Sequence, residues 1–155
     1  MLAAYFMDSS ALVKRYVAET GTDWIHKVAA PESQNPLIIA RITWVEVCSA
    51  LARRHREGVL SSEQVAFTVN NLRYDLDTQY QIVEFDRAVM DMAGQLVARH
   101  PLRAYDAVQL ASAVRILPAF TGAQSTYLIF AAADDCLLAA AQAEGLRTEN
   151  PNHHS

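Results

Sequence analysis

Four acidic residues lie where this sequence would otherwise be expected to carry apolar residues or ordinary helix caps. Asp8 ends one apolar run, and Asp134 comes just after another. Glu46 and Asp106 lie in stretches whose spacing of apolar residues predicts buried helices. An ionised carboxylate is costly to bury unless it is paired or bound to a cation. Arg103 is the nearest cation to Asp106, but we expect it to face away, so a metal site explains Asp106 better than a salt bridge.

Each of the other three acids also has a structural interpretation. Asp is as good a helix cap as Ser, so Asp8 fits a cap as well as a functional site. Glu46 and Thr43 fit a capping box, in which the third helical residue bonds back to the cap. Asp134 and Asp135 both precede a predicted helix. We take Asp134 as the functional acid and Asp135 as the cap or a supporting residue.

The elements that must position these acids alternate along the chain. Short apolar runs predict strands, and helix caps followed by helical apolar spacing predict helices between them. This alternation is typical of an α/β fold with a mainly parallel sheet and helices on both faces. We expect a single domain over residues 1–149 and a C-terminal tail over 150–155. The predicted strands are 2–7, 37–40, 80–84, 126–131 and 146–148, and the predicted helices begin near Ser9, Thr22, Thr43, Ser61, Asp86, Ala104 and Cys136.

Composition excludes several classes of protein. A chain of 155 residues with 52% hydrophobic residues is long enough for its own core and is not disordered. No apolar run reaches membrane-spanning length, and Asp8 interrupts the apolar start before it resembles a signal peptide. Cys48 and Cys136 lie in apolar helical patterns, and we expect reduced core thiols in a cytoplasmic protein. The net charge of −4 does not indicate a nucleic-acid binder, but it does not exclude one with a local basic rim.

Four motifs in this order resemble the PIN domain, and more narrowly the VapC toxins, the ribonucleases of type II toxin–antitoxin pairs. They are MDSSAL at 7–12, VE at 45–46, LRAYDAVQLA at 102–111 and ADDCLL at 133–138, with Ala141 and 144–146 beyond them. The resemblance runs from residue 2 to about 146. It implies a three-layer α/β/α fold, a parallel sheet of order 3-2-1-4-5, Mg²⁺ or Mn²⁺, and RNA cleavage. The family's acids fall on Asp8, Glu46, Asp106 and Asp134, and its small hydroxyl residue on Ser9. The segment 117–125 is somewhat longer than the family's usual connection.

The implied strand order would bring these acids together. Strands one and four would be neighbours, so Asp8 and Asp134 would meet at the point where the chain's direction across the sheet reverses. Helices would bring Glu46 and Asp106 within a few ångströms. Four such carboxylates cannot all ionise without compensating charge. Hard divalent cations supply that charge, lower the pKa of a bound water and stabilise the leaving oxygen of a phosphodiester.

Basic residues and apolar helix faces are candidates for contact with partners. A basic rim would contact RNA phosphates, although cations at a helix end also favour the negative end of its dipole. We expect an RNA substrate, a VapB-like antitoxin and a homodimer. Trp24 and the first two helices could form a protein-binding surface or ordinary core. The candidate RNA-contacting residues are Lys14, Arg15, Arg53, Arg54 and Arg56.

Two other functions remain open at this stage. Phosphoryl transfer through an aspartyl-phosphate at Asp8 usually requires a lysine late in the chain, and this sequence has only Lys14 and Lys27. A catalytically silent PIN-fold module that binds RNA or protein is the other alternative. Retention of all four acids argues against it without excluding it.

Overall fold

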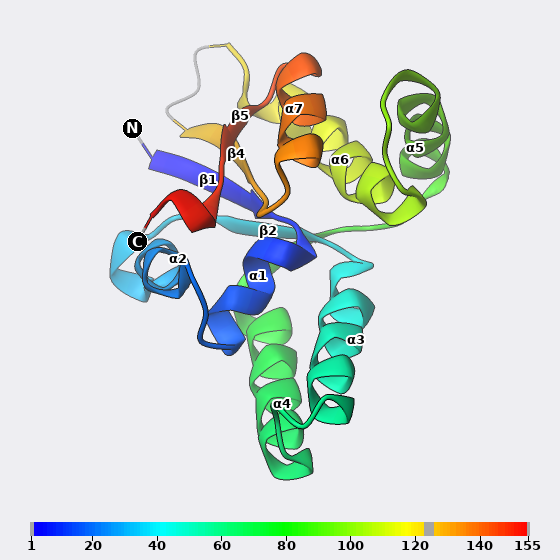
Figure 1. Cartoon of the computed structure of the whole chain (residues 1–155). Helices are drawn as coiled ribbons and strands as arrows, with labels where there is room; N and C mark the ends of the chain where they lie inside the picture. Colours follow the sequence, from blue (N-terminus) through cyan, green and yellow to red (C-terminus); the bar gives the residue numbers. More distant parts are fainter. Residues whose placement is uncertain (1, 123–125, 155) are drawn as a thin grey trace.

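A computed structural model, describing residues 2–122 and 126–154, shows a five-stranded sheet in the order β3-β2-β1-β4-β5 (Figure 1). All neighbouring strands are parallel. The predicted fold class and strand order are therefore confirmed. The strands are β1 (Leu2–Met7), β2 (Leu37–Ala40), β3 (Tyr80–Val83), β4 (Thr126–Ala131) and β5 (Arg147–Glu149).

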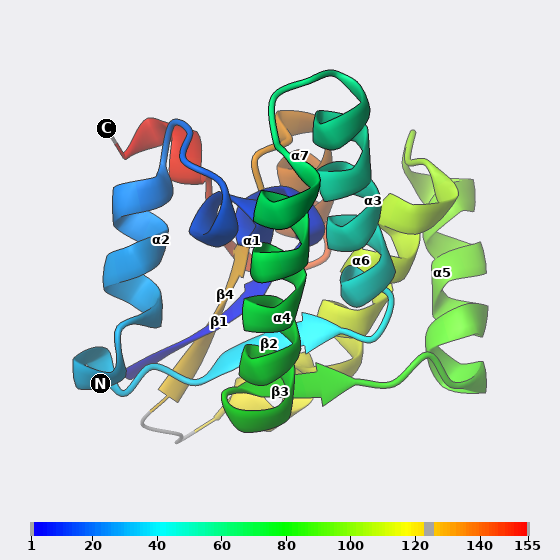
Figure 2. The ribbon, with the colours of Figure 1, turned by 90° about the horizontal axis from the view of Figure 1, so that it is seen from below.

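Helices cover both faces of this sheet (Figures 1 and 2). One face packs against α1 to α4 and the other against α5 to α7, and each interface has its own buried apolar cluster. On the α5–α7 side, the rings of Phe6 and Phe130 stack with centroids 5.6 Å apart. The helices are α1 (Ser9–Tyr16), α2 (Thr22–Ala29), α3 (Thr43–Arg56), α4 (Ser62–Thr78), α5 (Arg87–Arg99), α6 (Ala104–Ile116) and α7 (Asp135–Ala143), with short 3-10 turns at Pro31–Ser33, Leu117–Phe120 and Pro151–His153.

The register of the two central strands determines where the first and last acids lie. Met7, the last residue of β1, pairs with Ala131, the last residue of β4. The two strands therefore end at the same level of the sheet, and the backbone N–H of Asp8 donates to the carbonyl of Ala131 at 3.1 Å. This shared exit is the carboxyl edge of a parallel sheet at its switch point, where ligands bind in open α/β folds.

Several helix starts differ in detail from the sequence-based prediction. The residue before α2 is Gly21, not Thr22, and it adopts a positive φ of 91°. A β-carbon at Gly21 would come within 2.6 Å of the Pro151 carbonyl oxygen, so only glycine fits this close approach. Asp134, not Asp135, caps α7. By contrast, the predicted start at Ser61 is confirmed by a complete capping box with Gln64.

The residues after β5 pack against α2. Pro151 is buried, and the His154 ring stacks on Trp24 with centroids 4.6 Å apart. Trp24 also meets Tyr5 edge-on at 5.8 Å and packs against the core cluster under α1 to α4. The Trp24 ring therefore makes contacts within this chain on several sides.

Two further sequence-based expectations concern the cysteines and membrane-spanning helices. Both cysteines are free thiols, but Cys136 is exposed at the start of α7, so its predicted core position is wrong. Its place on the outer side of the first turn of α7 explains the difference. Among the described residues, no helix is both long and apolar enough to cross a membrane.

Candidate functional site

Asp8 lies at the junction of β1 and α1, and its side chain is buried. One carboxylate oxygen, Oδ1, accepts hydrogen bonds from the Ser10 hydroxyl at 2.7 Å and the Ala11 backbone N–H at 2.9 Å. The cap interpretation is therefore correct, and it leaves Oδ2 available. Burial raises the pKa of Asp8 to about 7, against the lowering effect of these hydrogen bonds, and the Glu46 and Asp106 carboxylates raise it further. A residue used only as a cap would not need two acidic neighbours.

Glu46 enters the same region from the first turn of α3. Its Oε1 accepts a hydrogen bond of 2.6 Å from the Gln109 amide. Residue 42 precedes the helix without a side-chain cap bond, so the capping box between Thr43 and Glu46 is not formed. Burial raises the pKa of Glu46, hydrogen bonds from Gln109 and Ser9 lower it, and Asp106 raises it. Glu46 is therefore directed to the other acids and not to its own backbone.

Asp106 and Asp134 complete the set from the other side of the sheet. Burial and the neighbouring Asp134 raise the pKa of Asp106, and Arg103 lowers it in part. The expectation that Arg103 faces away is wrong, because Arg103 is the N-cap of α6 and its charge reaches the carboxylate of Asp106 three residues later. Asp134 Oδ1 accepts from the backbone N–H groups of Cys136 at 2.9 Å and Leu137 at 3.1 Å.

The four acids form a chain of electrostatic neighbours around one edge of the sheet. The charges of Glu46 and Asp106 raise the pKa of Asp8, the charge of Asp106 raises the pKa of Glu46, and the charge of Asp134 raises the pKa of Asp106. Within residues 2–122 and 126–154, however, no three acidic, histidine or cysteine side chains are close enough to hold one metal ion. The expectation of a single tight cluster is therefore wrong for this arrangement of side chains.

The donor chemistry nevertheless fits a hard divalent cation. All four groups offer carboxylate oxygens, the ligands that Mg²⁺ and Mn²⁺ prefer. Among the salt bridges of the described residues, none involves these four acids. The pKa values of Asp8, Glu46 and Asp106 are raised, so their ionised forms are destabilised in this site. A bound cation would stabilise these ionised forms.

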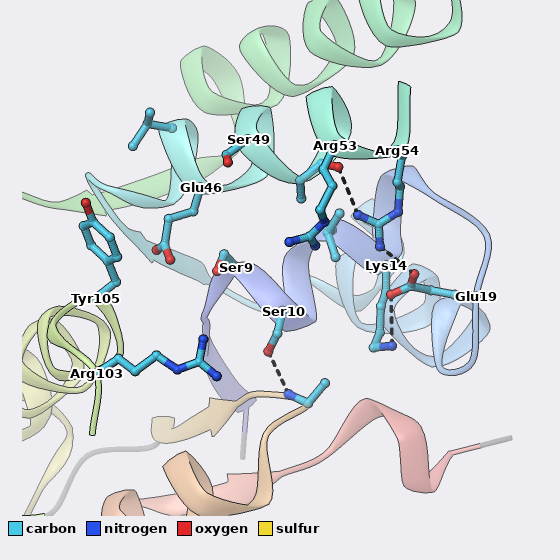
Figure 3. A pocket seen from close by; sticks show the side chains of 14 residues that line it. Ser9, Ser10, Lys14, Glu19, Glu46, Ser49, Arg53, Arg54, Arg103 and Tyr105 are labelled. Carbon is cyan, nitrogen blue, oxygen red and sulfur yellow. Dashed lines mark hydrogen bonds and ion pairs between the residues drawn. The ribbon is translucent and has the colours of Figure 1, made fainter. Parts of the chain in front are cut away.

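A second hydroxyl residue, Ser10, joins the segments that follow β1 and β4 at this edge. Its Oγ donates to Asp8 and accepts a 2.9 Å hydrogen bond from the backbone N–H of Ala133. Ala133 immediately precedes Asp134, so this pair of bonds ties the two acid-bearing segments together. Sequence reasoning assigned the supporting role to Ser9, which lies near Glu46 (Figure 3), and missed Ser10. Its position two residues after Asp8, typical of a side chain that bonds a cap, was the available signal.

A cleft of about 600 Å³ begins beside the acids and has two chemically different ends. Ser9, Glu46, Arg103 and Tyr105 line one end (Figure 3). The other end carries three cations, on α1 and on the last turns of α3. These are Lys14, Arg53 and Arg54.

The remaining predicted RNA contacts lie elsewhere. Arg15 does not line the cleft: its guanidinium donates to Gln79 Oε1 at 2.8 Å and to the Tyr80 hydroxyl at 2.7 Å, and lies 3.6 Å from Asp75. Arg56 is exposed on α3 outside the residues that line the cleft. Asp135 accepts a hydrogen bond from the Asn150 amide at 3.0 Å, which anchors the residues after β5.

The sequence of the chain is similar to that of a known protein family. The model of the PIN domain matches residues 5–116. Ribonucleases VapC45 and VapC49, both from Mycobacterium tuberculosis, are each 32% identical over 111 residues, which cover 72% of this chain and 75% of each relative.

Solved structures share the fold at lower identity. FitAcB from Neisseria gonorrhoeae matches with a TM-score of 0.62 at 16% identity, over 96% of this chain and 99% of that chain. A toxin–antitoxin complex from Klebsiella pneumoniae matches with a TM-score of 0.62 at 18% identity, over 96% and 98%. VapBC2 from Rickettsia felis, bound to a DNA fragment from their promoter, matches with a TM-score of 0.63 at 12% identity, over 95% and 98%. The match of the family model over most of the chain, together with these relatives, shows that the protein belongs to the PIN-domain family.

Proposed function

We propose that this protein is a metal-dependent endoribonuclease and the toxin of a type II toxin–antitoxin pair. The observation that carries the proposal is the group of carboxylates at the switch point of the sheet, in which the charge of one acid raises the pKa of a neighbouring acid, beside a cleft with a cationic end. The names of the VapC relatives support ribonuclease activity. The names of the toxin–antitoxin structural neighbours support the pairing.

Asp8, Glu46, Asp106 and Asp134 would hold Mg²⁺ or Mn²⁺ and supply the catalytic carboxylates. When bound, the ion supplies an activated water and stabilises charge on the leaving oxygen. The chain's own part is to orient these oxygens. Hydrogen bonds fix one oxygen of Asp8, Glu46 and Asp134 each, and burial shields Asp8 from competing water.

The cleft would bind the RNA backbone around the bond that is cut. Arg103 at one end of the cleft and the cations at its other end offer donors for phosphate oxygens (Figure 3). Attack by water on phosphorus breaks the bond to the 3′ oxygen, which takes a proton. The products then carry a 5′-phosphate and a 3′-hydroxyl, as the family resemblance implies.

The proposed partners are an RNA substrate, a VapB-like antitoxin and a second copy of this chain, in the cytoplasm. A catalytically silent module that binds RNA is the second candidate, because the cationic end of the cleft needs no metal ion to attract phosphate.

Cleavage of a mixed RNA pool separates these two functions. Purified protein is incubated with Mg²⁺ or Mn²⁺, and the ends of the products are identified. We expect cleavage by the wild type and none by Asp8→Asn or Asp106→Asn, which keep the side-chain shape but lose the charge. Asp77→Asn, an exposed acid on α4 outside the cleft, is the matched control and should cleave normally. Equal cleavage by wild type and Asp8→Asn would refute the proposed site.

A further inference from the structure

Gln109 connects helices that lie on opposite faces of the sheet. It lies on α6, and its side chain is only 1% exposed. The amide nitrogen Nε2 donates to Glu46 Oε1 at 2.6 Å and to Thr43 Oγ1 at 2.9 Å, both on the first turn of α3. One buried side chain of α6 therefore holds the start of α3, and it does so at an acid of the site.

The orientation of this amide is dictated by its neighbours. An ionised Glu46 carboxylate only accepts hydrogen bonds, so the amide must present its NH₂ group to it. The Gln109 carbonyl oxygen is then left buried without a partner among the described residues. A buried unpaired carbonyl is destabilising, and an apolar side chain of similar shape would avoid that cost. Packing alone does not account for a glutamine at this position.

Helix α6 also carries Asp106, three positions before Gln109. Residues three apart lie on the same side of a helix. The same stretch of α6 thus supplies one acid to the site and holds a second acid, Glu46, opposite it. Because the Gln109 bond occupies only part of the acceptor capacity of the carboxylate, Glu46 can still bind a cation.

We propose that Gln109 is a positioning residue that holds the Glu46 carboxylate in place for the metal ion. This inference rests on the proposed function, because it takes Glu46 as a metal ligand. Residues that orient metal ligands typically contribute 10- to 100-fold to metal affinity. Removing the amide should therefore weaken metal binding although Gln109 does not bind the ion itself.

The test measures Mn²⁺ binding by titration calorimetry in the absence of RNA, with the melting temperature of each metal-free variant. Gln109→Met keeps length and flexibility but loses the donor. We expect it to keep or raise the metal-free melting temperature, to weaken Mn²⁺ binding about 10- to 100-fold, and to lower kcat with little change in KM for RNA. Ser112→Ala is the matched control, since Ser112 is equally buried on α6 but its hydroxyl donates to the Val108 carbonyl of its own helix, at 2.7 Å. It should bind Mn²⁺ like the wild type.

A second variant, Gln109→Asn, keeps the test decisive if Gln109→Met does not fold. Gln109→Asn keeps a polar amide but is one methylene shorter and cannot reach Glu46, so it should show the same loss. Wild-type Mn²⁺ affinity in either folded variant, with affinity lost in Asp8→Asn, would overturn the role of Gln109 and leave the proposed function standing. If Asp8→Asn also binds Mn²⁺ like the wild type, the proposed metal site fails, and the role of Gln109 fails with it.

Discussion

The Glu19 carboxylate accepts a hydrogen bond from the Lys14 ammonium at 3.1 Å inside the cationic end of the cleft. Its other oxygen binds the Arg54 guanidinium, also at 3.1 Å. Two of the three cations at this end therefore share one internal anion. A phosphate of an RNA substrate would have to compete with Glu19 for them.

Replacing Glu19 by Gln should consequently strengthen RNA binding. Ion pairs that are partly exposed contribute up to about 1 kcal/mol, so we expect a two- to fivefold rise in affinity, roughly, together with a steeper salt dependence. Fluorescence anisotropy with the cleavage-deficient Asp8→Asn protein as background measures both. Glu84→Gln, which removes an exposed partner of Arg41 away from the cleft, is the control. A loss of affinity in Glu19→Gln would show that Glu19 organises the cations instead of competing for them.

Arg53 and Arg15 should respond differently to replacement by alanine. Arg53 is exposed in the cleft, so its loss should weaken RNA binding and reduce the salt slope by about one unit. Arg15 is engaged with Gln79, Tyr80 and Asp75, so its loss should lower the melting temperature. Arg56→Ala, outside the cleft, serves as a charge-matched control. If Arg15→Ala weakens RNA binding as much as Arg53→Ala without loss of stability, the structural role of Arg15 is wrong.

Features that depend on local pattern were predictable from the sequence. The apolar runs before Asp8 and Asp134 are continuous because both central strands are covered on two faces, and such runs predict buried parallel strands. The choice between Asp134 and Asp135 as cap was not predictable, since adjacent aspartates have the same capping propensity. Register and packing decide which one turns back to the helix.

Features that depend on long-range pairing were missed. Glu19 and Arg54 are 35 positions apart, and Gln109 and Glu46 are 63 apart, so no local pattern joins them. Arg103 is different. Its spacing of three from Asp106 predicts two residues on one side of a helix, and that signal was available.

The contribution of Asp8 to the stability of the metal-free protein should fall as pH rises from about 4 to about 7. The pKa of Asp8 is raised to about 7 from its ordinary value of 3.8, chiefly by burial. Between these values the folded state binds a proton that the unfolded state has lost, so rising pH favours unfolding. The shifts at Glu46 and Asp106 have the same sign.

Thermal melts in a chelator across this pH range measure the effect. We expect Asp8→Asn to flatten the profile, because it removes the most strongly shifted group. The wild type should lose on the order of a few kcal/mol of stability across the range relative to this variant. A profile of Asp8→Asn as steep as that of the wild type would place the titrating group elsewhere.

Mn²⁺ should raise the melting temperature of the wild type, and more strongly at pH 8 than at pH 5. An ion that binds only the folded state stabilises it by about 2.7 kcal/mol at one hundred times its dissociation constant. For a domain of this size that corresponds to a rise of roughly 5 to 10 °C. At pH 5 a proton competes with the ion for Asp8, which reduces the gain in melting temperature.

Asp8→Asn should lose most of this Mn²⁺-dependent increment, whereas Asp77→Asn should keep it. Because the Asn variant also lacks the repulsion that the ion relieves, its metal-free melting temperature at pH 8 should exceed that of the wild type. An equal Mn²⁺ increment in Asp8→Asn would mean that the ion binds away from the switch point.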